Sequence, residues 1–119
     1  MKARNVLAIL VMTVATTAHA DRIPTKAEVK AACTFGGSVV LLGMTLKDQG
    51  KDFDTADRAV RTQLVEGKPN REDLMMAEQM LMVELWADHF AGHSPEGAAK
   101  MQVHECVNNF ARMYPEIKW

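Results

Sequence analysis

The first twenty residues constrain the fold most, because they indicate the compartment in which the rest of the chain must fold. Two basic residues precede a short apolar stretch, Val6–Val14, and Ala18-His19-Ala20 lies directly before Asp21. A basic start, a short apolar core and small residues at the −3 and −1 positions are features of a cleaved secretory signal peptide. We therefore expect residues 1–20 to be removed during export to the bacterial periplasm, leaving residues 21–119 as the mature protein.

The length and charge of the mature chain limit its possible partners. Its 99 residues are enough for one hydrophobic core but not for two, so we expect a single domain. Without the two basic residues of the signal, 12 Lys and Arg face 15 Asp and Glu, a net charge of −3. No basic face is present to neutralise phosphates, which argues against nucleic acid and anionic membrane surfaces as partners. The longest uncharged run, Ala31–Leu46, has 16 residues with three glycines, so we expect no stable membrane insertion.

The two cysteines of the chain, Cys33 and Cys106, have a different meaning in an oxidising compartment than in the cytosol. After export, a disulfide is the expected state of such a pair. A catalytic redox pair normally lies two residues apart at a helix start, whereas these cysteines are far apart in the sequence. The sequence therefore predicts a structural disulfide that stabilises the fold by about 4 kcal/mol in the chain-entropy model.

Helix start and stop signals are clear at two places. Thr25 followed by Glu28 is a capping box, and the helix that it starts should continue to about Asp48 or Gln49, before Gly50. Ser94-Pro95-Glu96 combines an N-cap with a proline at the first helical position. This last helix should end before Pro115.

Two further helices are predicted between these. Asp54-Thr55 should cap a short helix from about Ala56 to Glu66, and Asn70 should cap a third helix that continues to about Phe90. No long stretch alternates apolar and polar residues, so strands are not expected. The sequence thus predicts an all-α fold of four helices.

The positions of the cysteines favour an approximately up-down-up-down arrangement. Cys33 lies eight residues after Thr25, and Cys106 lies eight residues before Tyr114, each about 12 Å from its helix end. Antiparallel first and fourth helices would bring the two cysteines level, as required for a disulfide between these helices.

Three glycines lie inside the first helix: Gly36, Gly37 and Gly43. A glycine inside a helix costs up to about 1 kcal/mol relative to alanine, so a compensating contact is expected. Gly36 and Gly43 are one heptad apart on one face of the helix, and we expect another helix to approach closely there. A bend or a small ligand-accepting groove is the alternative.

The third helix carries more large apolar residues than one core-facing stripe can hold. Its polar strip is narrow, with Glu78 beside it and Asp73, Glu84 and Asp88 along it. We expect part of the apolar surface to stay open for a protein partner or a second copy of the chain. The candidate partner-binding residues are Met75, Met76, Met82, Val83 and Trp86. Thioethers also bind soft metals such as copper(I), but methionines at helical spacing more often fill a core.

A weaker alternative is a metal site at Asp88, His89 and His93. Two histidines four residues apart with neighbouring carboxylates are typical of metal sites. However, Gly92 indicates that the helix ends between the histidines, which favours a solvated helix end. No metal or other cofactor is therefore expected. Catalysis is not expected either, since neither mature serine has the sequence context of a nucleophile.

The spacing of caps and cysteines resembles that of small two-cysteine secreted bacterial helical proteins of unknown function. The resemblance rests on Cys33, the turn Lys47-Asp48-Gln49-Gly50, the helix start Ser94-Pro95-Glu96-Gly97-Ala98, and Cys106. The chain departs from the pattern at Trp86, where tyrosine is usual. The resemblance implies a periplasmic helical fold and leaves the activity open.

These observations favour a periplasmic protein without catalytic activity that binds another protein, as an inhibitor or an immunity protein does. Two alternatives remain open. One is a chaperone that shields apolar segments of other proteins, in which acidification would expose apolar surface. The other is a carrier of a metal or small ligand that uses the methionines and histidines of the third helix.

Overall fold

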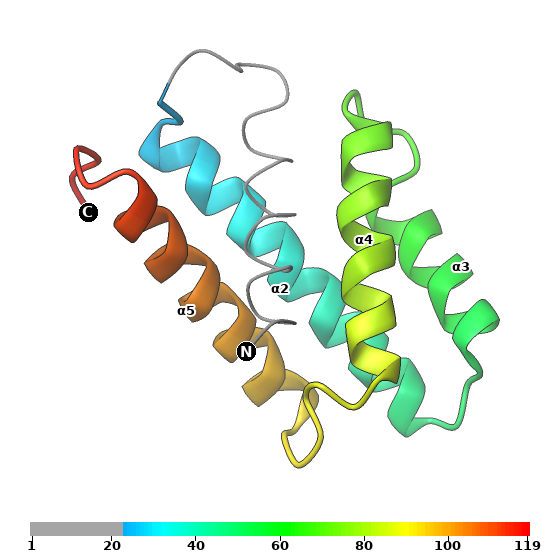
Figure 1. Cartoon of the computed structure of the whole chain (residues 1–119). Coiled ribbons are helices and arrows are strands. Elements are labelled where there is room, and N and C mark those ends of the chain that lie inside the picture. Colours follow the sequence, from blue (N-terminus) through cyan, green and yellow to red (C-terminus); the bar gives the residue numbers. More distant parts are fainter. Residues whose placement is uncertain (1–22) are drawn as a thin grey trace.

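The computed structural model describes residues 23–119, and the predicted signal peptide with its cleavage site lies outside them. This part of the chain contains four helices and no strand (Figure 1). The helices are α2 (Lys26–Asp48), α3 (Phe53–Leu64), α4 (Arg71–Trp86) and α5 (Pro95–Met113). The prediction of an all-α fold with four helices is confirmed.

Helix α2 is the central element and packs against each of the other three helices. Helix α5 lies antiparallel along it, while α3 and α4 form a helical hairpin against its C-terminal half (Figure 1). The chain direction alternates from helix to helix, so the approximate up-down-up-down order is also confirmed. The short α3 makes the arrangement less regular than a symmetric four-helix bundle.

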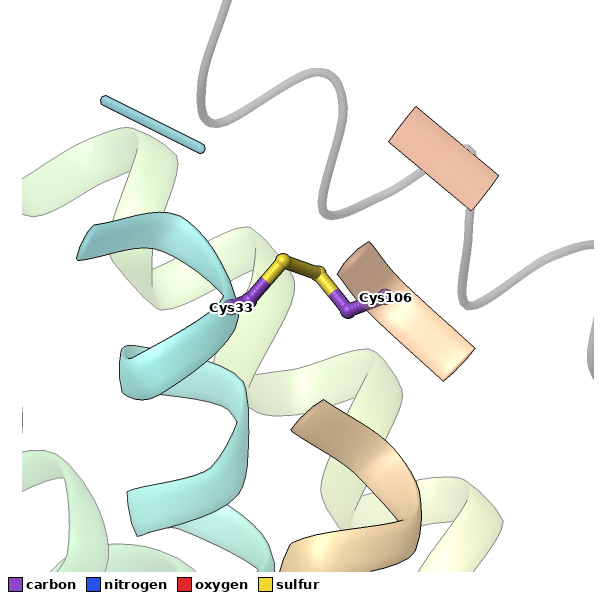
Figure 2. The surroundings of a disulfide bond; sticks show 2 residues. All are labelled: Cys33 and Cys106. Atoms are coloured by element: carbon purple, nitrogen blue, oxygen red, sulfur yellow. A yellow bond between two sulfur atoms is a disulfide. The ribbon is translucent and has the colours of Figure 1, made fainter. Parts of the chain in front are cut away.

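The disulfide between Cys33 and Cys106 joins α2 to α5 (Figure 2). The Cα atoms of the two cysteines are 5.5 Å apart, within the usual range for a bridged pair. A small apolar cluster surrounds the bridge, and its other buried members are Val29, Ala32 and Phe110. This bridge between the first and the last helix confirms the predicted pairing.

A larger apolar cluster lies where α3 and α4 pack on α2. Its buried members come from all four helices and from the α4–α5 connection: Val39, Val40, Met44, Ala56, Val60, Leu81, Met82, Leu85, Phe90 and Ala98. The described part of the protein therefore has two adjoining core regions, one at the disulfide and one beneath the α3–α4 hairpin.

Close helix packing explains two of the three glycines in α2. A Cβ atom at Gly37 would lie 2.5 Å from Val103 Cγ2 of α5, and one at Gly43 would lie 2.7 Å from Leu85 Cδ1 of α4. A Cβ at Gly36 would lie 3.4 Å from Gln102 Nε2, which is an ordinary contact. The predicted close approach is thus confirmed at Gly43, which faces α4. At Gly36 it was wrong, because the glycine that α5 approaches closely is its neighbour Gly37.

The two strongest helix starts have the predicted caps. Thr25 Oγ1 accepts a hydrogen bond from the Glu28 amide at 3.1 Å, and the Thr25 amide donates to Glu28 Oε1 at 2.8 Å. Ser94 Oγ accepts a hydrogen bond from the Gly97 amide at 3.0 Å. Helix α2 ends before Gly50, which has the left-handed φ of +81° that favours glycine after a helix.

The predicted bounds of α3 were wrong by a few residues. The N-cap is Asp52, whose Oδ1 accepts from the Thr55 amide at 2.8 Å, so α3 begins at Phe53 instead of Ala56. This earlier start places the Phe53 ring against Trp86, with ring centroids 5.6 Å apart. The use of Asp52 instead of Asp54 as the N-cap therefore goes together with the contact between Phe53 and Trp86.

Helix α4 ends at Trp86, four residues before the predicted end. Lys47 Nζ donates to the Leu85 carbonyl oxygen at 2.9 Å and pairs with Asp88 Oδ1 at 2.7 Å. Asp88 has a φ of +62°, which stops the helical path. A lysine from α2 thus caps α4 at a place that local sequence does not mark. At the other end of α4, Asn70 holds the predicted N-cap position, but its side chain makes no capping hydrogen bond.

Among the described helices, α2 alone is long and apolar enough to meet the length and hydropathy requirements of a membrane span. Half of its most apolar stretch is buried inside the protein. Core helices of globular proteins also meet these requirements, and α2 is covered by three helices and bridged to one of them. The absence of stable membrane insertion stays a prediction.

Candidate functional site

Two large apolar side chains on α4 face solvent. Met76 is 51% exposed and Val83 is 54% exposed. They are seven residues apart, so they lie two turns apart on the same side of the helix. The prediction that part of the apolar surface of this helix stays open is confirmed.

These two residues belong to the lining of a groove between α3 and α4, which we call the methionine groove. Its volume is about 390 Å³. The residues that line it are Phe53 and Asp57 from α3, and Met76, Gln79, Met80 and Val83 from α4. Four of the six are large and apolar, so the groove suits an apolar side chain of a partner, and the exposed Gln79 offers a hydrogen-bonding amide group.

The other candidate partner-binding residues have different positions. Met75 and Trp86 are partly buried, and the Trp86 ring lies edge-on to Phe53 with Lys47 Nζ 5.5 Å from its centroid. Met82 is fully buried. Its place among the partner-binding residues is therefore corrected: its sulfur would lie 2.9 Å from a Cβ at Gly43, so this side chain fills the space that the glycine leaves between α2 and α4.

Next to Asp57, which lines the groove, lies a buried carboxyl group, that of Glu78, which the sequence places beside the polar strip of the helix. Glu78 is completely buried, and its Oε1 is 3.8 Å from Arg61 Nε, too far for a hydrogen bond. Arg61 instead binds Asp57 through Nη2 and Oδ2 at 2.7 Å. Within the described part of the chain, no side-chain or backbone donor reaches either Glu78 oxygen.

The surroundings of Glu78 favour its protonated form. Burial raises the pKa of Glu78 most, the hydrogen bond with Asp57 and the negative charge of Asp57 add to this, and Arg61 opposes it, so that the pKa is about 9. At neutral pH, Glu78 is therefore a neutral acid that can donate its proton to Asp57 in a hydrogen bond. Because Glu78 itself is closed off from solvent, it is not placed to exchange a proton with a substrate in the groove.

A sequence signal for Glu78 was available. Leu74, Glu78, Leu81 and Leu85 follow heptad spacing, which puts Glu78 in the row of buried leucines. On α3, Asp57 and Arg61 are four residues apart and form an ion pair along the helix. What the sequence does not contain is the contact between the two helices that brings these groups together.

The residues of the alternative metal site do not converge. His89 is partly buried, its Nδ1 is 3.7 Å from Glu84 Oε2, and its ring lies edge-on to Phe90. His93 is exposed in the connection to α5, and Asp88 is paired with Lys47. No group of three or more histidine, cysteine or carboxylate side chains in residues 23–119 is arranged to hold a metal ion.

Comparisons with protein-family models, with curated proteins and with solved structures gave no match. The resemblance to small two-cysteine secreted proteins therefore stays a prediction.

Proposed function

We propose that this protein is exported and binds another protein through the methionine groove, without catalysing a reaction. The observation that carries this proposal is the exposure of Met76 and Val83, large apolar side chains that no other described helix covers. Exposed apolar side chains gathered at a groove mark interaction sites more often than isolated ones do.

The groove suits a partner that inserts apolar side chains between α3 and α4. Methionine is unbranched and polarizable, so Met76 and Met80 can adapt to the shape of an inserted side chain. An amphipathic helix laid along α4 would place its apolar residues at the spacing of Met76 and Val83. Binding one partner in this way is how an inhibitor or immunity protein works, and this is the form of the proposal that we favour.

Export is supported by two independent features. The N-terminal sequence has the organisation of a signal peptide, and the disulfide between Cys33 and Cys106 is compatible with an oxidising compartment such as the periplasm. Mass spectrometry of the exported protein tests this part directly. Asp21 is expected as the first residue, and a mature form that retains Met1 would contradict cleavage.

The chaperone alternative gains no support from Glu78. Because the pKa of Glu78 in the folded protein is about 9, above its ordinary value of 4.5, the fold favours the protonated form. The stability that this group contributes is full below pH 4.5 and is lost as the pH rises toward 9. Acidification therefore does not unfold the protein through this residue, whereas an acid-triggered chaperone requires exposure of apolar surface at low pH.

The test of the binding proposal compares two methionines of nearly equal exposure. Met76 in the groove is 51% exposed, and Met113 at the end of α5 is 52% exposed. The partner is isolated from the native host with the wild-type protein and identified by mass spectrometry. Its affinity is then measured by titration calorimetry for the wild type, Met76→Glu and Met113→Glu.

We expect Met76→Glu to weaken the complex by at least about tenfold, since a charge would have to be buried against apolar groups. The control Met113→Glu should bind like the wild type and should have the same melting temperature as Met76→Glu. Equal affinities of all three proteins would contradict the proposed site. If sedimentation analysis finds only complexes of two copies of this chain, the partner is a second copy of the chain and the proposal of a foreign partner is wrong.

A further inference from the structure

A second groove lies between α2 and α5, on the disulfide-bridged pair of helices. Its volume is about 530 Å³. Leu41 of α2 and Val103 and Val107 of α5 contribute large apolar side chains to its lining, and Leu41 is 40% exposed. Among residues 23–119, none lines both this groove and the methionine groove.

Small residues between the two helices shape this groove. Gly37 and Ala99 line it, and Gly37 lets Val103 approach to a distance that a Cβ atom would block. On α2 the lining extends from Thr34 to Leu41, seven residues and therefore about 10 Å of helix. A trough of this length with apolar walls matches an alkyl chain of medium length.

The polar side chains that line the groove include basic residues but no acidic one among the described residues. Lys100 and His104 of α5 line it, and Thr34 and Ser38 of α2 add hydroxyl groups. None of the described residues that line it is acidic, although the chain as a whole carries a net charge of −1. The His104 ring is anchored by Asn108, with 3.0 Å between Nε2 and Nδ2. The groove thus combines apolar walls with a basic edge, which is complementary to a molecule with an apolar tail and an anionic head.

We propose that the groove between α2 and α5 binds a free medium-chain alkyl carboxylate. The carboxylate head lies at Lys100 and His104, where the ammonium group and the imidazole can donate hydrogen bonds. The alkyl chain lies along Leu41 and Val103. This site is separate from the proposed protein-binding groove, so either proposal can fail without the other.

Titration calorimetry of the mature, disulfide-bonded protein with decanoate tests this proposal. We expect saturable binding of one molecule per chain with a Kd of about 0.1 mM, as ligand-efficiency limits allow for a ligand of this size. Decyltrimethylammonium, with the same alkyl chain and the opposite charge, should bind at least about tenfold more weakly. Equal affinity for the two head groups, or no saturation by decanoate, would overturn the proposal.

Three variants locate the site. Lys100→Glu should weaken decanoate binding about fivefold, the order expected for reversing a partly solvated ion pair, whereas Lys51→Glu, at an exposed position in the α2–α3 turn, should leave it unchanged. Leu41→Gln, also at an exposed position, should weaken binding through the loss of apolar contact. Unchanged affinity in both Lys100→Glu and Leu41→Gln would overturn the site.

Two further measurements separate this site from other uses of the same face. Met76→Glu should bind decanoate like the wild type, because it alters only the methionine groove. Cosedimentation with vesicles of anionic phospholipid should show no binding. Binding to these vesicles without binding of free decanoate would identify the face as a membrane surface and overturn the proposal.

Discussion

The α2–α5 pair and the α3–α4 hairpin are stabilised in different ways. Helices α2 and α5 have 23 and 19 residues, pack closely through Gly37 and are joined by the disulfide. Helices α3 and α4 have only 12 and 16 residues and are not joined by a disulfide. The buried Glu78 of α4 faces Arg61 of α3. The second pair also carries the half-exposed Met76 and Val83.

We propose that this difference reflects different roles of the two halves. A buried carboxyl group and exposed apolar side chains both lower stability relative to a fully apolar interior and a polar surface. Features of this kind are often kept at functional sites while the rest of the fold supplies the stability. We propose that the bridged pair is the stable frame and that the hairpin, which carries the methionine groove, is the part that contacts a protein partner.

The largest expected effect comes from removing the bridge. Replacing both cysteines, Cys33→Ser with Cys106→Ser, should lower the free energy of unfolding by about 4 kcal/mol, because the bridge closes a loop across 73 positions. Urea unfolding of the variant and the wild type measures this loss. Amide hydrogen exchange should show that α5 loses protection more than α4. A loss below about 1 kcal/mol would show that packing alone holds α2 and α5 together.

The second prediction concerns Glu78. Glu78→Gln should raise the free energy of unfolding at pH 7 by about 1 to 3 kcal/mol, because the wild type must bind a proton on folding and the variant does not. The wild type should lose stability as the pH rises from 4.5 toward 9, and the variant should lose much less over this range. Urea unfolding at a series of pH values measures both curves.

The matched control for this change is Glu72→Gln, an exposed glutamate in the first turn of α4. It should keep the pH dependence of the wild type. If the free energy of unfolding of Glu78→Gln depends on pH as strongly as that of the wild type, Glu78 is not the group that makes the hairpin the less stable half.

The adjacent glycines of α2 offer a third, smaller effect. Gly37→Ala should destabilise the protein by about 1 to 2 kcal/mol, since its Cβ would overlap with the branched Val103 side chain. Gly36→Ala should be neutral or stabilise by up to about 1 kcal/mol, because its Cβ fits and alanine favours the helix. Thermal unfolding of both variants measures the difference. The same change in both would mean that close packing of α2 and α5 does not stabilise the frame.

The smallest expected effect distinguishes the helix caps of the two halves. Ser94→Ala should cost about 1 kcal/mol because it removes the hydrogen bond to the Gly97 amide at the start of α5. Asn70→Ala should change stability by less than about 0.5 kcal/mol, since the Asn70 side chain makes no capping hydrogen bond at the start of α4. Urea midpoints of the two variants measure this contrast. Equal losses would remove the distinction between these helix starts.

The sequence predicted the helix starts of the α2–α5 pair more accurately than the bounds of the helices in the α3–α4 hairpin. The start of α2 and the start of α5 are fixed by capping residues within three positions of each other, so local sequence was sufficient to predict them. The start of α3 and the end of α4 depend on the packing of Phe53 on Trp86 and on Lys47 at the Leu85 carbonyl. These contacts join residues far apart in the chain, so the local sequence pattern could not predict them.

The candidate site shows a similar limit. Helical periodicity indicated that α4 carries too many apolar residues to bury them all, and the exposure of Met76 and Val83 agrees with this. It did not separate Met76 from Met82, because which methionine is buried depends on where α2 lies and on the space beside Gly43. A small ligand-accepting groove was only the alternative interpretation of the glycines in α2. The sequence could not place the groove between α2 and α5, since its walls come from two helices far apart in the chain.

The sequence by itself determined the helical class, the two strongest helix starts and the choice of disulfide partners. These depend on hydrogen bonds within one helical turn, on the period of apolar residues, and on there being one pair of cysteines. Only the tertiary structure decided that Glu78 is buried and neutral, that Met82 belongs to the core, and where the two grooves lie. Burial, the pKa of a carboxyl group and the shape of a groove depend on which helices meet, and residues distant in the sequence supply the atoms that cover or expose each side chain.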